Sequence, residues 1–167
     1  GTIQIDSVEN QGTFIHVVIP FEIAEEPAVV QEMSELPKEN LSGCRILLAE
    51  DNELNREIAA FLLKDEGISV TEAEDGQQAL ELFKEKPAGT FDAILMDLMM
   101  PIMDGYTATR EIRSLERSDS KTIPIIAMTA NAFQEDAEKC IAVGMNAHLA
   151  KPLDIEKMKK TIKSICS

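Results

Sequence analysis

The chain has 167 residues, and with 44% of them hydrophobic it can bury the core of one ordinary domain with a smaller appendage. Its 30 acidic residues against 16 basic ones give a net charge of −14, which excludes the clustered Lys and Arg surface of a nucleic-acid-binding protein. The 3 cysteines are far apart, and no apolar run approaches the about 18 residues of a membrane span. We therefore expect a cytoplasmic protein with reduced thiols and no direct membrane contact.

Residues 1–21 are predicted to form a β-hairpin. Thr2–Ser7 alternates between apolar and polar residues, and Thr13–Ile19 is strand-like again. An isolated hairpin is marginal in water, so we expect its apolar residues to pack on the rest of the chain or on a second copy of it.

Residues 22–42 are predicted to be an acidic linker, because they hold two prolines and six glutamates, with at most one frayed helical turn near Val29–Leu36. The chain starts with Gly1 rather than Met and shows no signal peptide. We therefore expect it to be a piece of a longer protein.

Residues 43–167 repeat a strand followed by a helix five times. The predicted strands are Arg45–Glu50, Ser69–Ala73, Phe91–Asp97, Pro124–Thr129 and Ala147–Ala150. The predicted helices are Glu53–Glu66, Gly76–Lys86, Gly105–Glu116, Phe133–Val143 and Ile155–Ile165. Apolar residues recur with helical spacing in the last helix (Ile155, Met158, Ile162, Ile165) and the first (Leu54, Ile58, Phe61, Leu62). This pattern predicts a doubly wound α/β domain with a parallel sheet.

Several of the predicted strands end in a polar residue. Glu50 ends the first and Asp51 follows it, Asp97 ends the third, Thr129 ends the fourth, and Lys151 follows the fifth. The carboxyl ends of parallel strands meet at one edge of the sheet, where ligands bind, so we expect these five side chains to converge.

The chemistry of these groups suits phosphoryl transfer. Three carboxylates close together repel one another unless a cation neutralises them, and oxygen ligands of this kind suit Mg²⁺. A shielded Asp97 could then attack phosphorus, while the Thr129 hydroxyl and the Lys151 ammonium contact phosphoryl oxygens. Each residue alone would more often be an ordinary strand end or helix start; their joint occurrence in this order predicts a phosphoacceptor site.

These residues and their neighbours resemble the receiver domain of two-component response regulators over residues 43–167. The resemblance implies a flavodoxin-like (βα)₅ fold with a five-stranded parallel sheet in the order 2-1-3-4-5. It implies Glu50 and Asp51 as the acidic metal-binding pair and Asp97, in Met96-Asp97-Leu98-Met99-Met100-Pro101, as the phosphoacceptor.

The same resemblance assigns the remaining site residues. It implies that the backbone carbonyl of Met99 completes a Mg²⁺ site, that Thr129 is a switch residue, and that Lys151 is followed by a cis bond to Pro152. His148 stands where receivers commonly carry a switching aromatic, so it would turn inward when Thr129 moves toward the phosphoryl group. A partly exposed strand histidine without that role is the alternative.

The first 20 residues resemble the closing hairpin of a histidine-kinase ATP-binding domain, through Gly1-Thr2-Ile3-Gln4-Ile5-Asp6-Ser7 and Gly12-Thr13-Phe14. Kinase end, acidic linker and receiver, in this order, are the layout of a hybrid sensor histidine kinase. The layout implies a phosphohistidine of the kinase as donor. It also implies a histidine phosphotransfer domain as acceptor, docked beside Asp97 through the first helix. Because the ATP-binding and histidine-bearing segments are missing, we expect the chain to catalyse only its own phosphorylation and dephosphorylation.

Two other functions compete with this one. A phosphatase of the haloacid-dehalogenase type also forms an aspartyl phosphate, but it needs a second aspartate two residues after the nucleophile, and Met99 stands there. A module that docks on a histidine kinase without being phosphorylated would keep the fold and bind Mg²⁺ yet accept no phosphoryl group.

Overall fold

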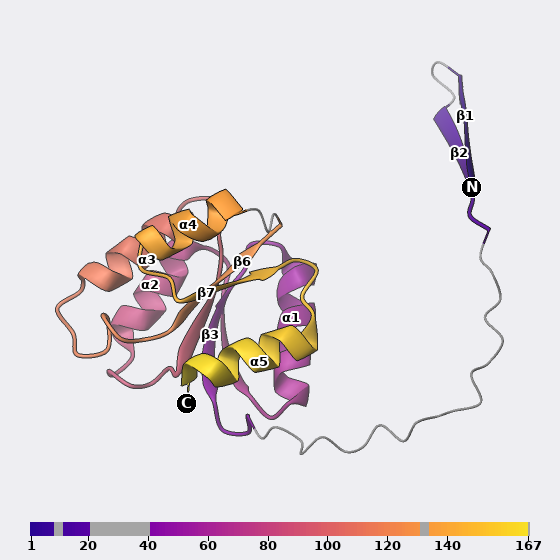
Figure 1. Cartoon of the computed structure of the whole chain (residues 1–167). Coiled ribbons are helices and arrows are strands. Elements are labelled where there is room, and N and C mark those ends of the chain that lie inside the picture. The colour runs from indigo at the N-terminus through magenta and orange to yellow at the C-terminus, as the bar shows by residue number, and fades with distance from the viewer. Residues whose placement is uncertain (9–11, 21–40, 131–133, 167) are drawn as a thin grey trace, which may run out of the picture. The chain divides into compact units, whose positions relative to one another are not determined.

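The structure is a computed structural model that describes residues 1–8, 12–20, 41–130 and 134–166 (Figure 1). The chain divides into two units, an N-terminal hairpin and an α/β domain, and each is described by itself. Most of the predicted linker over residues 22–42 lies outside the described residues. Within the described part of the chain, no helix is both long and apolar enough to cross a membrane.

The N-terminal unit contains the predicted hairpin. Strands β1 (Thr2–Val8) and β2 (Gly12–Val18) pair antiparallel with Ile5 opposite Ile15. The hydroxyls of Ser7 and Thr13 are hydrogen-bonded across the pair at 2.9 Å. Every residue of both strands is exposed, so the hairpin has no apolar core of its own. Its predicted packing on the chain or on a second copy stays a prediction.

The α/β domain is built on a five-stranded parallel sheet in the order β4-β3-β5-β6-β7 (Figure 1). The strands are β3 (Arg45–Ala49), β4 (Ser69–Ala73), β5 (Ala93–Asp97), β6 (Ile125–Thr129) and β7 (Ala147–Ala150). Counted within this domain, the order is 2-1-3-4-5, as predicted. The central strands β5 and β6 are buried throughout, because helices cover both faces of the sheet.

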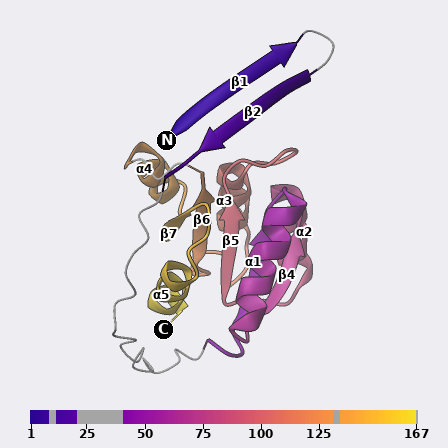
Figure 2. The same cartoon turned by 90° about the vertical axis from the view of Figure 1, so that its right-hand side faces the viewer.

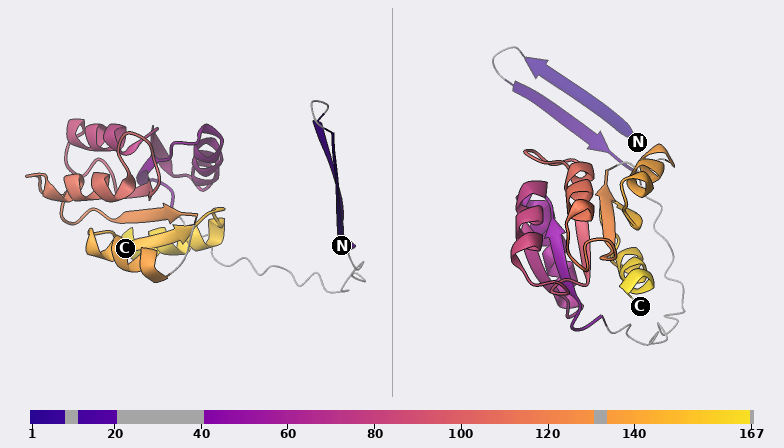
Figure 3. Two further views of the ribbon diagram at one scale, coloured as in Figure 1. Left: turned by 90° about the horizontal axis from the view of Figure 1, so that it is seen from above. Right: turned by 90° about the vertical axis from the view of Figure 1, so that its left-hand side faces the viewer.

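The domain has five helices in the described residues, α1 to α5. They form the two outer layers, as Figures 1 and 3 show. Helices α1 (Glu53–Asp65) and α5 (Ile155–Cys166) pack on one face through Leu63, Met158 and Ile162. Helices α2 (Gly76–Glu85), α3 (Gly105–Ser114) and α4 (Gln134–Ala142) cover the other face; Figure 2 shows the domain turned by 90°. Each face thus has its own apolar core, separated by the sheet.

Three helices begin with the same type of cap at the edge where the strands end. The side chains of Asn52, Asp75 and Asp104 accept the amide three residues later, at 3.0, 2.8 and 2.7 Å, and start α1, α2 and α3. A cap of this type contributes about 1 kcal/mol, so the sequence fixes where these helices begin. The segments before α1 and α3 carry the acidic residues of the candidate site, Glu50, Asp51 and Asp97.

The predicted boundaries differ from the structure by one or two residues, for local reasons. The third strand of the domain was predicted from Phe91 but starts at Ala93, since the Asp92 carboxylate turns to accept the Arg45 amide and guanidinium, both at 2.8 Å. Helix α3 was predicted to reach Glu116 but ends at Ser114, because Leu115 has extended backbone. The predicted start of α4 at Phe133 lies outside the described residues.

Candidate functional site

The structure brings all five predicted strand-end residues to the carboxyl edge of the sheet. Glu50 and Asp51 follow β3, Asp97 ends β5, Thr129 ends β6 and Lys151 follows β7. Glu50, Asp97 and Thr129 are only 2%, 5% and 6% exposed, whereas Asp51 is exposed. The site is therefore a buried polar floor with one carboxylate at the solvent side.

Lys151 joins two of the buried carboxylates. Its Nζ lies 2.5 Å from Glu50 Oε2 and 2.6 Å from Asp97 Oδ2, so it donates to both. Burial lowers the pKa of Lys151, but the hydrogen bonds and negative charges of Asp97 and Glu50 outweigh it, and the net pKa is raised above its usual value. The ammonium is thus held charged against the atom that would receive a phosphoryl group.

The three carboxylates form a cluster suited to a hard cation. One oxygen each of Glu50, Asp51 and Asp97 lies within 4.8 Å of the others. Three oxygens at this separation can reach one ion, and a partly solvated oxygen site with few protein ligands is what Mg²⁺ prefers. The residues present therefore fit the predicted metal.

The backbone around Asp97 is tightly constrained. The Met99 amide donates to Asp97 Oδ1 at 3.2 Å, while the predicted role of the Met99 carbonyl as a metal ligand stays a prediction. A Cβ on Gly105 would lie 2.2 Å from the Asp97 carbonyl oxygen, so only glycine lets α3 start this close to β5.

The backbone at Lys151 is held in the same way. The Lys151 amide donates to the Thr129 carbonyl at 2.7 Å, and the Lys151–Pro152 bond is cis, as predicted.

Two residues that support Glu50 were not assigned a role from the sequence. Asn55 Nδ2 donates to Glu50 Oε1 at 3.2 Å, and Arg56 Nη1 donates to the Glu50 carbonyl at 2.8 Å. Arg56 also lies 3.8 Å from Glu72 and 3.7 Å from Glu74. Their position in the first turn of the helix that follows the acidic pair is the sequence signal that could have indicated this role, because residues there lie close to Glu50.

The apolar stripe predicted for α1 is not its core face. Of its four predicted members, Leu54, Ile58 and Phe61 are 64%, 50% and 68% exposed, and Leu62 is partly buried against the core. The buried side of the helix is formed by Ala59, Ala60 and Leu63. Helical spacing alone did not distinguish the two faces, because both carry apolar residues. The exposed face begins at the turn that follows Asp51, so it borders the site.

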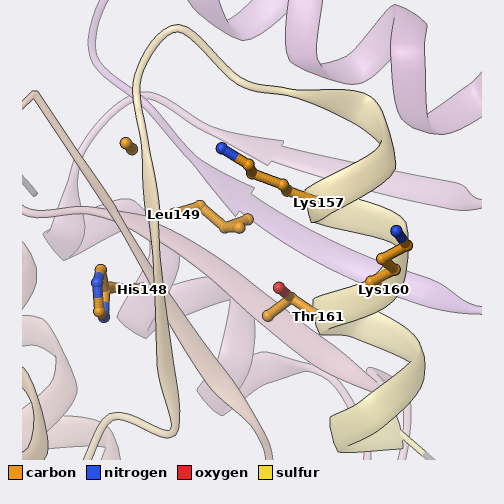
Figure 4. A pocket seen from close by; sticks show the side chains of 6 residues that line it. His148, Leu149, Lys157, Lys160 and Thr161 are labelled. Atoms are coloured by element: carbon orange, nitrogen blue, oxygen red, sulfur yellow. The ribbon is translucent and has the colours of Figure 1, made fainter.

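His148 lies on β7 with its side chain exposed. It lines a cavity of about 350 Å³ in which residues from β7 and α5 meet (Figure 4). Figure 4 shows Lys157, Lys160 and Thr161 on the α5 side and Leu149 on the strand. An exposed His148 is expected in the unphosphorylated state. The inward turn on phosphorylation stays a prediction.

Sequence comparison identifies the family. The response regulator receiver domain model matches residues 46–163. Histidine kinase 1 of Arabidopsis thaliana is 38% identical over 158 residues, which cover 77% of this chain and 13% of that protein. Hybrid signal transduction histidine kinase L of Dictyostelium discoideum is 33% identical over 164 residues, or 98% of this chain and 9% of that protein. The chain thus spans a small part of the length of these relatives.

Solved structures agree with this assignment. The receiver domain of a Pseudomonas aeruginosa PAO1 sensor histidine kinase, with a magnesium ion coordinated in its active-site cleft, is 42% identical with a TM-score of 0.67, covering 75% of this chain and 98% of that one. The receiver domain of Ssk1, in co-crystals with the Saccharomyces cerevisiae phosphotransfer protein Ypd1, is 32% identical in sequence with a TM-score of 0.66. The match covers 73% of this chain and 88% of that one. The chain therefore belongs to the response regulator receiver domain family, the receiver class of two-component phosphorelays.

Proposed function

We propose that Asp97 accepts the phosphoryl group. The observation that carries this is the placement of its carboxylate, 5% exposed, between the acidic pair Glu50 and Asp51 and the Lys151 ammonium at 2.6 Å. A carboxylate oxygen of Asp97 attacks phosphorus, the phosphorus–nitrogen bond of a phosphohistidine breaks, and the imidazole leaves. Positioning and charge neutralisation are the main demands of this reaction, and the site supplies both.

Each neighbouring side chain has a separate task. Lys151 supplies a fixed positive charge to one phosphoryl oxygen, and the Thr129 hydroxyl, at the end of the adjacent strand, donates to another. Glu50 holds Lys151 at 2.5 Å and keeps it at Asp97 before the donor arrives. These groups are fixed by the sheet, so little reorganisation is needed during transfer.

Magnesium is the metal that we propose for this site. Glu50, Asp51, Asp97 and the carbonyl of Met99 would hold it, and the related Pseudomonas aeruginosa receiver carries a magnesium ion in its active-site cleft. When bound, Mg²⁺ neutralises the carboxylates and the charge on the transferred group.

We propose that the chain is part of a hybrid histidine kinase. Residues 1–21 would close the kinase ATP-binding domain, 22–42 form an acidic linker and 43–167 form the receiver. The match to the Dictyostelium kinase supports this layout, since it runs through 98% of the chain and so includes the hairpin. The parent protein would act in the cytoplasm, with a kinase phosphohistidine as donor.

A histidine phosphotransfer domain is the acceptor that we propose. Leu54, Ile58 and Phe61 expose an apolar stripe on α1 beside the acidic pair, and exposed apolar patches mark interaction sites. A hollow of about 150 Å³ lies between this helix and the segment after β7, lined by Glu50, Asn55, Ile58, Ala59, Lys151, Pro152 and Leu153. A partner helix on this face would bring its histidine over Asp97. The related Ssk1 receiver domain was co-crystallised with the histidine phosphotransfer protein Ypd1.

His148 is the element that we propose to couple phosphorylation to the β7 and α5 surface. It lies on the strand next to Thr129 and is exposed, so movement of Thr129 toward the phosphoryl group frees space beneath it. Histidine NMR signals of the phosphorylated chain should shift for His148 and not for His16, which lies in the hairpin. Equal shifts or none would rule the coupling out.

The metal requirement distinguishes this function from a docking module that is never phosphorylated. Thermal unfolding is followed while Mg²⁺ is added to the native chain and to Asp51→Asn, and phosphorylation by a small acyl phosphate is followed on the same samples. We expect Mg²⁺ to stabilise the native chain and start phosphorylation, and both effects to weaken in the variant. Mg²⁺ binding by the native chain without any phosphorylation would favour the docking module.

A further inference from the structure

Asp51 is the carboxylate of the acidic cluster that the structure holds least directly. Unlike Glu50 and Asp97 it is exposed, and its side chain forms no hydrogen bond or ion pair with any residue that the structure describes. Neither burial nor a partner therefore fixes this carboxylate. Its place in the cluster, with all three carboxylates within 4.8 Å, depends on the backbone on either side of it, at Glu50 and Asn52.

Two residues in the first turn of α1 hold that backbone. The Arg56 guanidinium donates from Nη1 to the Glu50 carbonyl at 2.8 Å, and the Asn55 side chain donates to Glu50 Oε1 at 3.2 Å. The backbone amides of the same two residues donate to Asn52, that of Asn55 to its side chain at 3.0 Å and that of Arg56 to its carbonyl at 2.9 Å. Asp51 thus lies in the middle of a turn that Asn55 and Arg56 hold both before and after it.

The geometry of Arg56 shows which of its contacts is the tight one. Its side chain is only 12% exposed, and its ion pairs with Glu72 and Glu74 measure 3.8 and 3.7 Å, longer than hydrogen bonds. The bond to the Glu50 carbonyl is the short one, so the guanidinium is directed at the backbone beside Asp51. The two glutamates balance its charge, which allows it to stay nearly buried in this position.

Arg56 acts on a bound cation in two opposite ways. As a positive charge near the acidic cluster it repels Mg²⁺, so through its charge alone its removal would tighten metal binding. As the donor to the Glu50 carbonyl it fixes the turn, and without that bond the exposed Asp51 carboxylate has to be ordered when the metal binds, which costs affinity. The sign of the change in Mg²⁺ affinity therefore distinguishes the two effects.

We propose that Asn55 and Arg56 are positioning residues for the metal, which hold the turn at Asp51 in the conformation that Mg²⁺ binding needs. The inference rests on the proposed function, and it concerns how tightly the site takes up its metal rather than how Asp97 reacts. Removing a group that orients metal ligands typically lowers metal affinity about 10- to 100-fold. The lower end applies to Arg56, because it acts through one carbonyl and its charge has the opposite effect.

The test compares Arg56→Met with Lys64→Met as a matched control. Both variants keep an apolar stem and remove one positive charge from α1. Lys64 pairs with Glu72, as Arg56 does, but at 3.0 Å and from the last turn of the helix, and no hydrogen bond or ion pair among the described residues joins it to Glu50. Asn55→Ala is the second variant; it changes no charge and places a good helix former at an exposed position.

Two quantities are measured on each variant. Isothermal titration calorimetry gives the Mg²⁺ dissociation constant, and phosphorylation by a small acyl phosphate is followed against Mg²⁺ concentration. We expect the dissociation constant to rise about tenfold in Arg56→Met and about threefold in Asn55→Ala, and to stay within about twofold of native in Lys64→Met. The rate at saturating Mg²⁺ should stay within about threefold of native in all three, because the reacting groups are intact.

A purely structural role would lower the temperature of unfolding and leave the Mg²⁺ dissociation constant of the folded chain unchanged. An unchanged or smaller dissociation constant in Arg56→Met would therefore overturn the inference, and the same result in Asn55→Ala would do so if Arg56→Met does not fold. An equal rise in Lys64→Met would also overturn it. A native chain that binds no Mg²⁺, or that binds it and accepts no phosphoryl group, would instead contradict the proposed function.

Discussion

Replacing Lys151 with methionine tests how the site is held together. Methionine keeps the length and much of the apolar stem but removes the ammonium that lies 2.5 Å from Glu50 and 2.6 Å from Asp97. The side chains of these two acids are only 3% and 7% exposed, so the substitution leaves two buried carboxylates without their cation. Breaking a buried ion pair by removing one partner costs about 3–5 kcal/mol.

The lower end of that range applies here. The Lys151 side chain is 20% exposed, and Asp51 opens the cluster to water, so solvent screens part of the repulsion. We expect a loss of about 3 kcal/mol in the free energy of unfolding at pH 7, or a fall of about 10 °C in Tm for a domain of this size. Urea denaturation and thermal unfolding followed by circular dichroism measure the two quantities. Mg²⁺ should recover part of the loss, because it replaces the missing positive charge.

Lys157→Met is the matched control. Lys157 is exposed on α5, and its removal should change the free energy of unfolding by less than about 0.5 kcal/mol. Since the pKa of Lys151 is raised in the folded state, its stabilising effect is complete below the ordinary lysine pKa and is lost as pH rises through the folded value. The difference between native and Lys151→Met should therefore shrink only at strongly alkaline pH. Equal stabilities of the two lysine variants at pH 7 would refute this account of the site.

Three further substitutions probe the packing and hydrogen bonding of the α/β domain. The Thr109 hydroxyl is buried without a hydrogen-bond partner among the described residues, so Thr109→Val should raise the free energy of unfolding by about 1–2 kcal/mol in urea; a loss would contradict this. Asp119 accepts Arg117 at 2.5 and 2.8 Å, and these hydrogen bonds lower its pKa. Asp119→Asn should therefore cost about 1–3 kcal/mol at pH 7, with the difference fading as pH falls below about 4 through the folded pKa; a constant difference down to acid pH would argue against the pair. Gly105→Ala places a Cβ 2.2 Å from the Asp97 carbonyl oxygen, so it should cost about 1–3 kcal/mol and slow phosphorylation; a fully active, equally stable variant would show that the start of α3 can shift freely.

The sequence was most informative where a single physical rule determines the structure, as it does for the sheet and for the residues at its carboxyl edge. The central strands are continuous apolar runs, and each is followed by a polar residue, so the parallel sheet and the convergence of Asp97, Thr129 and Lys151 could both be predicted. The order of the strands came from the family resemblance and is confirmed by the pairing. The roles of these residues rest on the same resemblance and on their geometry.

Other features could not be predicted, because they depend on contacts between segments far apart in the chain. The apolar spacing of Leu54, Ile58 and Phe61 is that of a core face, and only the packing of Ala59 and Ala60 against the sheet shows that they point outward. Ile102, in the loop between β5 and α3, has a positive φ of 66°, which follows from hydrogen bonds to α2 and α3 at both ends of that loop, and isoleucine itself argues against it. The Thr109 hydroxyl, which has no hydrogen-bond partner in the described part of the chain, has no signature in the sequence.

The intact mass of the chain after incubation with Mg²⁺ and a small acyl phosphate tests the central claim most directly, with Asp97→Asn measured in parallel. The account predicts one added phosphoryl group on the native chain and none on Asp97→Asn, because Asp97 is the carboxylate that Lys151 and the acidic pair surround. A phosphoryl group on the variant would place the acceptor elsewhere. A native chain that folds and binds Mg²⁺ but gains no mass would contradict the phosphoacceptor function itself.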